Sequence, residues 1–188
     1  MFCQRWLPAF AVCLSLLVGC NSSGTGSGVA GIASGVPTPF ASAEGKFTIM
    51  APGTMVESQQ QVQTEAGAVT LYMFLHEKSD SEAYIASYAD YDSQLTELVD
   101  PNDVLDGSRD GAVGNMGGTL TSETRITANG FPGRDLVISA TVEGRTVSAR
   151  MRIFLVKNRL YQIMGLEEGA NGVSAAIVAY LDSFKLID

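Results

Sequence analysis

One stretch, residues 134–166, constrains the fold of this 188-residue chain more than any other. Apolar and polar residues alternate in it with a period of two, which is typical of strands whose two faces meet different surroundings. Glu143-Gly144 fits a two-residue hairpin loop, and a second reversal falls within Lys157-Asn158-Arg159. The stretch therefore predicts three consecutive antiparallel strands at the centre of a sheet.

The loop at Glu143-Gly144 also predicts the register of the first two strands. Apolar residues face one another on one side and hydroxyl residues on the other, in the pairs Ala140 with Val147, Ile138 with Ala149, Leu136 with Met151, Thr141 with Thr146 and Ser139 with Ser148. A single register thus satisfies both faces of the hairpin.

Further strands and two helices are expected on either side of this meander. Strand-forming residues occupy 47–49, 55–64, 69–76, 83–91 and 119–128, and residues 55–64 are polar enough for an exposed edge. Asp100-Pro101 starts a helix that Gly107, Gly111 and Gly114 weaken, and a last helix follows residues 169–172. This order predicts the α+β class, with helices packed on the faces of a mainly antiparallel sheet.

The tyrosines of residues 83–91 gather on one side of their predicted strand. Tyr84 and Tyr88 share a face with Ala86 and Asp90, and we expect this face to look toward a covering helix. Tyrosines packed with their hydroxyls at the rim explain the pattern more simply than a row that stacks on a ligand.

The first 19 residues have the layout of a secretory signal peptide. Arg5 precedes an apolar run from Trp6 through Val18, which is too short to span a membrane comfortably. The residues that end it, Leu17-Val18-Gly19-Cys20, resemble the lipobox of bacterial lipoproteins. The resemblance implies removal of the signal before Cys20 and acylation of its sulfur, whereas the alternative is an ordinary signal with a chance cysteine.

Acyl chains on Cys20 would by themselves fix the protein to a membrane. Each buried CH₂ contributes about 0.8 kcal/mol, so two or three chains give durable attachment. By analogy with Gram-negative sorting, Asn21 favours the periplasmic side of the outer membrane. The predicted organisation is a signal peptide over residues 1–19, a lipidated cysteine and flexible linker over 20–39, and one folded domain over 40–188.

Charge and residue types exclude several functions. The formal charge is −8, and because Arg5 is the only charged residue before Cys20, it is −9 for the chain that starts there, which makes nucleic acid a poor partner. His76 is the only histidine, so a Ser-His-Asp triad and a histidine-rich zinc site are excluded. Residues 106–117 imitate a calcium loop, but glycine stands where the bidentate glutamate belongs. We therefore expect no metal and no cofactor.

Three arginines of the meander are candidate partner-binding residues: Arg134, Arg150 and Arg152. They could bind an anionic partner or form salt bridges with acids of the helices, and the salt bridges are the simpler interpretation. The many carboxylates also leave open a carboxylate-based hydrolase such as a periplasmic glycosidase, which would need two acids converging in a cleft.

Several segments together resemble PsbP-like and DcrB-like lipoprotein domains: EGKFTIMAPG, LYMFLHE, AYIASYADYD, GFPGRDL, RMRIFLVKNRLYQIMG and YLDSFKL. The resemblance implies an α-β-α sandwich with a central antiparallel sheet. It also implies an extracytoplasmic protein that binds partners, because its landmark residues include no catalytic group. Together with Cys20, it predicts a membrane-anchored, non-catalytic binding module of the cell envelope with a protein partner.

Overall fold

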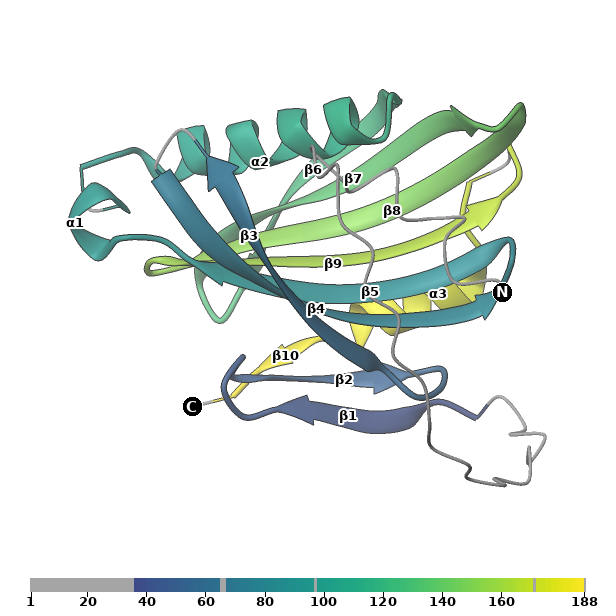
Figure 1. Ribbon diagram of the computed structural model, residues 1–188, viewed down its shortest axis with the longest axis horizontal. Helices are drawn as coiled ribbons and strands as arrows, with labels where there is room; N and C mark the ends of the chain where they lie inside the picture. The colour runs from purple at the N-terminus through teal and green to yellow at the C-terminus, as the bar shows by residue number, and fades with distance from the viewer. Residues whose placement is uncertain (1–35, 65–66, 97, 171, 188) are drawn as a thin grey trace, which may run out of the picture.

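A seven-stranded antiparallel sheet forms the centre of the computed structural model, which describes residues 36–64, 67–96, 98–170 and 172–187 (Figure 1). From one edge to the other its strands are β3 (Val56–Thr64), β4 (Gly67–Ser79), β5 (Glu82–Asp90), β9 (Arg159–Glu168), β8 (Arg145–Val156), β7 (Phe131–Val142) and β6 (Thr119–Ala128). The predicted signal peptide, Cys20 and most of the predicted linker lie outside the described residues.

The predicted meander is confirmed as β7, β8 and β9, with the expected register. Ala140 pairs with Val147, and Leu136 with Met151. Glu143 and Gly144 both have positive φ, 51° and 79°, which is the conformation that matches the twist of a two-residue hairpin. The second loop consists of Lys157 and Asn158, because Val156 pairs with Arg159.

A second, three-stranded sheet joins the two ends of the domain. It contains β1 (Thr38–Ser42), β2 (Phe47–Ala51) and β10 (Lys185–Leu186), with β2 in the middle. β1 begins two residues before the expected start of the folded domain. In Figure 1 this small sheet lies below the large one.

The helices lie on opposite faces of the large sheet. α2 (Pro101–Asn115) packs on β7 and β8, while α3 (Ala175–Asp182) packs on β8, β9 and β2; α1 (Ser93–Thr96) is a single turn. The start of α2 agrees with the prediction, since the Asp100 carboxylate accepts a hydrogen bond from the Asn102 backbone N–H at 2.8 Å. Despite its three glycines, α2 is a continuous helix. None of the helices in the described residues is long and apolar enough to cross a membrane.

Two hydrophobic cores sandwich the large sheet. The α2 core lies between α2 and the sheet and includes Leu105, Leu136 and Met151. The aromatic core lies on the opposite face, under the small sheet and α3, and includes the buried rings Phe47, Tyr84, Tyr88, Phe154, Tyr161 and Tyr180. Alternation along each strand sends neighbouring residues to different cores.

The predicted fold class, α+β with an α-β-α sandwich, is wrong: the fold is β-rich. Strands make up 59% of the described residues and form two sheets. Only α2 covers a face as a helical layer. The other face is covered mainly by the small sheet, because strands from the two ends of the described domain pair with each other, Leu186 with Phe47, rather than extending the large sheet. α3 has only eight residues and leaves much of that face to strands.

Candidate partner-binding site

Asp135 of β7 holds together the two arginines of β8. Asp135 and Arg152 are cross-strand partners, so their side chains lie on the same face, and Arg150 follows two residues away on that face. The Asp135 carboxylate accepts hydrogen bonds from Arg150 Nε at 2.8 Å, Arg150 Nη2 at 3.0 Å and Arg152 Nε at 2.9 Å. Arg152 Nη2 also donates to Asp182 Oδ1 at 2.5 Å, at the end of α3.

Electrostatics keep this cluster ionised. Asp135 is 7% exposed, and its burial acts to raise the pKa of the carboxyl. The hydrogen bonds from Arg150 and Arg152 outweigh burial, so the pKa of Asp135 lies below its ordinary value. The same bond to Asp135 raises the pKa of Arg150. Two carboxylates therefore balance two guanidinium groups, and the cluster adds no net charge to its surroundings.

A pocket of about 510 Å³ opens beside Arg152. It lies where the end of β6, the middle of β8, the end of α3 and β10 meet, and its lining consists of Ile126, Thr127, Ala128, Asn129, Arg152, Phe154, Leu181, Phe184, Lys185 and Leu186. None of these lining residues is acidic. The pocket thus combines an apolar wall with two cations.

Two phenylalanines form the aromatic wall of this pocket. The rings of Phe154 and Phe184 stack with centroids 5.6 Å apart and an interplanar angle of 7°. Gly133 faces Phe154 across β7 and β8, and a Cβ at Gly133 would lie 2.5 Å from Phe154 Cδ1. The glycine of the GFPGRDL segment is therefore needed for the ring to lie against the sheet.

Both cations of the pocket keep hydrogen-bonding capacity. Arg152 uses Nε and Nη2 on Asp135 and Asp182, and its Nη1 has no partner among the described residues. Lys185 is exposed and forms no ion pair with any described residue. An anionic group in the pocket could therefore accept hydrogen bonds without displacing an existing contact.

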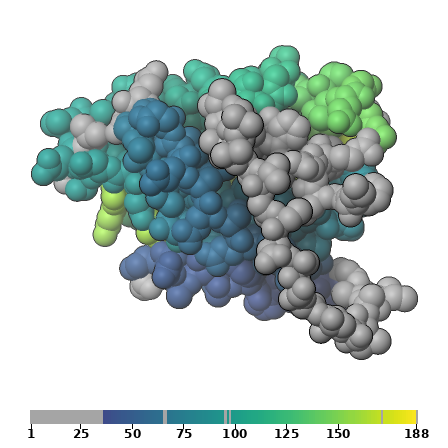
Figure 2. Space-filling model, in the orientation of Figure 1, coloured from purple at the N-terminus to yellow at the C-terminus, as the bar shows by residue number. Residues whose placement is uncertain are grey.

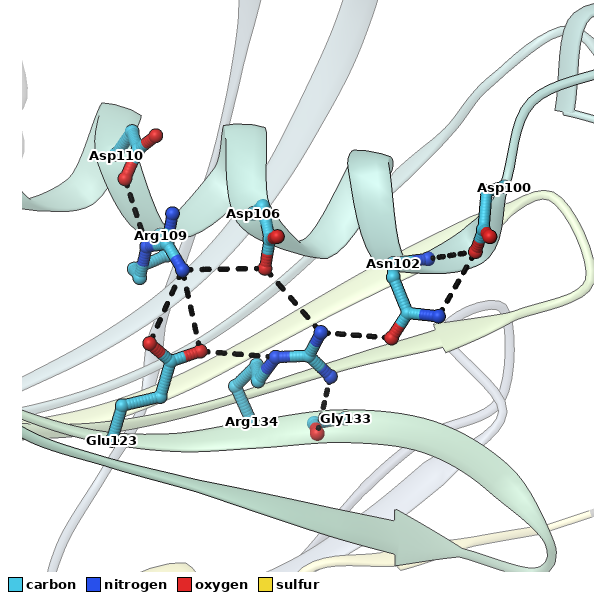
Figure 3. A network of polar contacts seen from close by, with 8 residues as sticks. All are labelled: Asp100, Asn102, Asp106, Arg109, Asp110, Glu123, Gly133 and Arg134. Atoms are coloured by element: carbon cyan, nitrogen blue, oxygen red, sulfur yellow. Dashed lines mark hydrogen bonds and ion pairs between the residues drawn. The ribbon is translucent and has the colours of Figure 1, made fainter.

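Arg134 lies between α2 and the sheet, as Figure 3 shows. Strand alternation places it on the face opposite to its neighbour Asp135 and to the pocket. The Arg134 side chain is 2% exposed, with Nε 3.0 Å from Glu123 Oε1 and Nη2 2.8 Å from Asn102 Oδ1 and 3.3 Å from Asp106 Oδ1. Arg109 extends the network to Glu123 at 3.2 Å. Arg134 therefore clamps α2 onto β6 and β7, and its burial favours a structural role.

Comparisons with known proteins bear on the fold. No protein-family model matches the chain, and no curated protein matches its sequence. Cyanobacterial PsbP (CyanoP) from Synechocystis sp. PCC 6803 matches in structure with a TM-score of 0.51 and 16% identity, over 86% of this chain and 98% of that one. The fold is PsbP-like. LpqN, involved in cell envelope biogenesis of Mycobacterium tuberculosis, matches at a TM-score of 0.40 and 10% identity, over 83% of this chain and 88% of that one. The fold assignment rests on CyanoP, whose score is above 0.5.

The PsbP-like fold places the other sequence candidates away from the pocket. His76 Nδ1 lies 3.1 Å from the Thr54 carbonyl oxygen, and its ring fills the space above Gly53. Tyr84 packs edge-on against Tyr180 of α3, with centroids 5.1 Å apart, so it faces a helix as expected. The tyrosine row belongs to the aromatic core.

The calcium-like segment is helical rather than a loop. Residues 106–115 belong to α2, so their oxygen atoms project around a helix instead of converging on one point. Within residues 36–64, 67–96, 98–170 and 172–187, no group of three or more His, Cys, Asp and Glu is placed to hold a metal ion.

The sequence alone did not separate Arg134 from the other partner-binding candidates, and it did not point to Lys185. Arg134 and Asp135 are adjacent in sequence, but strand alternation sends them to opposite faces, and that rule alone could have separated their roles. Lys185 gave no such signal, because only the packing of β10 near β6 and β8 brings it beside Arg152.

Proposed function

We propose that this protein is a lipoprotein of the cell envelope, anchored through acyl chains on Cys20, whose PsbP-like domain binds a protein partner and catalyses no reaction. The anchor is supported by the signal layout and the lipobox-like residues that end at Cys20. Binding is supported by one observation above the others, the pocket of about 510 Å³ beside Arg152 and Lys185.

The pocket suits a segment that carries a carboxylate next to an apolar side chain. Arg152 Nη1 and the Lys185 ammonium can donate to the carboxylate, while Phe154, Phe184 and Leu181 can cover the apolar group. No lining residue is acidic, and because Asp135 and Asp182 already balance the charges of Arg150 and Arg152, the Lys185 ammonium is the unbalanced positive charge that would attract an anion.

The same lining argues for binding over carboxylate-based hydrolysis. A glycosidase needs two carboxyl groups about 5 to 9.5 Å apart at one cleft. Asp135 and Asp182, the acids nearest Arg152, are both engaged by its guanidinium group and lie outside the lining. The pocket therefore offers cations to a ligand and no pair of acids to a glycosidic bond.

The anchor is tested by Cys20→Ser in the full chain. We expect the variant to move from the membrane fraction to the soluble fraction and to lose incorporation of labelled fatty acid, because its hydroxyl cannot be acylated in the same way. Retention of the variant in membranes at the level of the unsubstituted protein would reject the anchor.

The pocket is tested by reversing its exposed charge. The lipidated protein captures partners from detergent-solubilised membranes, and Lys185→Glu is expected to lose the specific partner because it places an anion where the partner's carboxylate binds. Lys157→Glu, an equal charge change at an exposed residue of the β8–β9 loop, is the control and should retain the partner. Equal recovery with both variants would reject the pocket as the binding site.

A further inference from the structure

The large sheet ends at β3, and the outer edge of β3 pairs with no strand among the described residues. Nine residues of β3 pair with β4 in unbroken register, from Val56 with Leu75 to Thr64 with Gly67. In an antiparallel pair, alternate N–H and C=O groups point away from the partner strand, so β3 presents a regular row of free donors and acceptors. Most of its residues are exposed, and Figure 2 shows its blue surface at the front of the molecule.

The other sheet edges in the described residues carry protective features that β3 lacks. β6 has a register irregularity between Leu120 and Ser122, β1 has five residues and includes Pro39, and β10 has two residues. Bulges, prolines and shortness all hinder the addition of another strand. β3 has the sequence VESQQQVQT, with no proline, glycine or lysine and with Glu57 as its only charge.

We propose that β3 is the interface between two copies of this chain, which pair antiparallel about a two-fold axis at Gln60. In this register Gln59 of one copy faces Gln61 of the other, and Ser58 faces Val62. The contact uses the same surface on both copies and closes on itself, as two-fold interfaces do. The two large sheets then form one continuous sheet.

The side chains of β3 suit this self-pairing. Glu57 of one copy faces the neutral Gln63 of the other, so no like charges meet across the interface. The amides of Gln59 and Gln61 lie opposite each other and can exchange hydrogen bonds. The residues next to Gln60 are therefore identical in both directions, and the positions further out bring no like charges together.

Val56 and Val62 lie on one face of β3 and add apolar contact area to the proposed interface. Within the single chain these residues pair with Leu75 and Val69 of β4, which are only partly buried. A two-fold axis perpendicular to the sheet keeps this face on the same side in both copies. On this face Thr64 of the second copy lies opposite Val56, and Ser58 lies opposite Val62, so their side-chain carbons remove part of the two valines from water.

A cysteine at the two-fold axis tests both the partner and the register. Gln60→Cys, introduced into the full chain in membranes, is expected to give a covalent dimer on mild oxidation, because cross-strand Cα atoms about 5 Å apart are within disulfide range. Gln63→Cys lies on the same strand, but its counterpart in the second copy is six residues away along β3, about 20 Å. It should give no dimer alone and should give one when mixed with Glu57→Cys.

A charge at the axis gives an independent measurement. Gln60→Lys brings two ammonium groups together at the interface, so the detergent-solubilised full chain is expected to sediment with half the protein mass of the unsubstituted protein. Three results would overturn the proposal: an unsubstituted protein that sediments as one chain, equal dimer yields from Gln60→Cys and Gln63→Cys, or a cross-link from Gln60→Cys to a different protein.

Discussion

Asp135 is the residue on which both arginines of the candidate site depend. It accepts three hydrogen bonds from Arg150 and Arg152, and it is 7% exposed, whereas Asp182, the other acid of the cluster, is 58% exposed at its side chain. A buried acceptor is replaced poorly by water, and an exposed one is replaced easily. The two acids should therefore differ in their contribution to stability although both bind Arg152.

This difference is measurable with matched substitutions. Asp135→Asn keeps the shape of the side chain but removes its charge, so we expect the free energy of unfolding at pH 7 to fall by about 2 kcal/mol. Asp182→Asn removes an exposed partner of the same arginine and should lower it by less than about 1 kcal/mol. Urea denaturation measures both variants. Equal losses would show that burial of Asp135 does not determine its role.

The lowered pKa of Asp135 also predicts a dependence on pH. A carboxyl whose pKa is lower in the folded state contributes stability above its unfolded pKa, about 3.9, and that contribution is lost as the pH falls through the folded value. The unsubstituted protein should therefore lose more stability than Asp135→Asn between about pH 5 and pH 2. Thermal unfolding across this range tests the expectation, and parallel curves for the two proteins would contradict it.

Among the elements, those whose structure depends on residues close together in the sequence were predictable. The hairpin of β7 and β8 follows from strand alternation and from a loop whose two residues both take positive φ, and α2 follows from its Asp100-Pro101 start. The small sheet was not predictable, because β10 has only two residues and its partner β2 lies at the other end of the domain. The pocket depends on that small sheet, so sequence could suggest Arg152 but could not place Lys185 beside it.

Glycines in α2 allow a prediction at the element scale. A Cβ built at Gly111 meets no heavy atom within 4 Å outside the helix's own neighbouring backbone, so Gly111→Ala should raise the free energy of unfolding by about 0.5 to 1 kcal/mol through the higher helix propensity of alanine. Gly165→Ala is the contrasting variant, since its Cβ would lie 2.5 Å from Ile177 Cγ2 and should destabilise the protein. Chemical denaturation compares the two, and a loss of stability with Gly111→Ala would contradict the assignment of this position to an unstrained helix.

At the scale of the whole molecule, the large sheet contributes side chains to both hydrophobic cores. Alternate residues of β8 enter the α2 core and the aromatic core, as Met151 and Phe154 do. The small sheet is held to the large one through Phe47, which is fully buried and lies 5.8 Å from Phe74 and 6.2 Å from Tyr161 between ring centroids. Loss of either core therefore removes packing from the same strands, and we expect the domain to unfold as one unit.

Substitutions on opposite sides of the sheet test this cooperativity. Phe47→Ala in the aromatic core should lower the free energy of unfolding by about 3 to 5 kcal/mol, and Leu105→Ala in the α2 core by about 2 to 5 kcal/mol. Five of the six described tyrosines lie in or against the aromatic core and only Tyr91 packs against the α2 core, so tyrosine fluorescence reports mainly the aromatic side, whereas far-UV circular dichroism reports the strands of both sides. In each variant the two signals should share one midpoint, because the large sheet cannot keep its register when either face loses its cover. A Phe47→Ala protein whose tyrosine signal changes well before its circular dichroism would instead show that the small sheet and α3 detach while the meander and α2 remain folded.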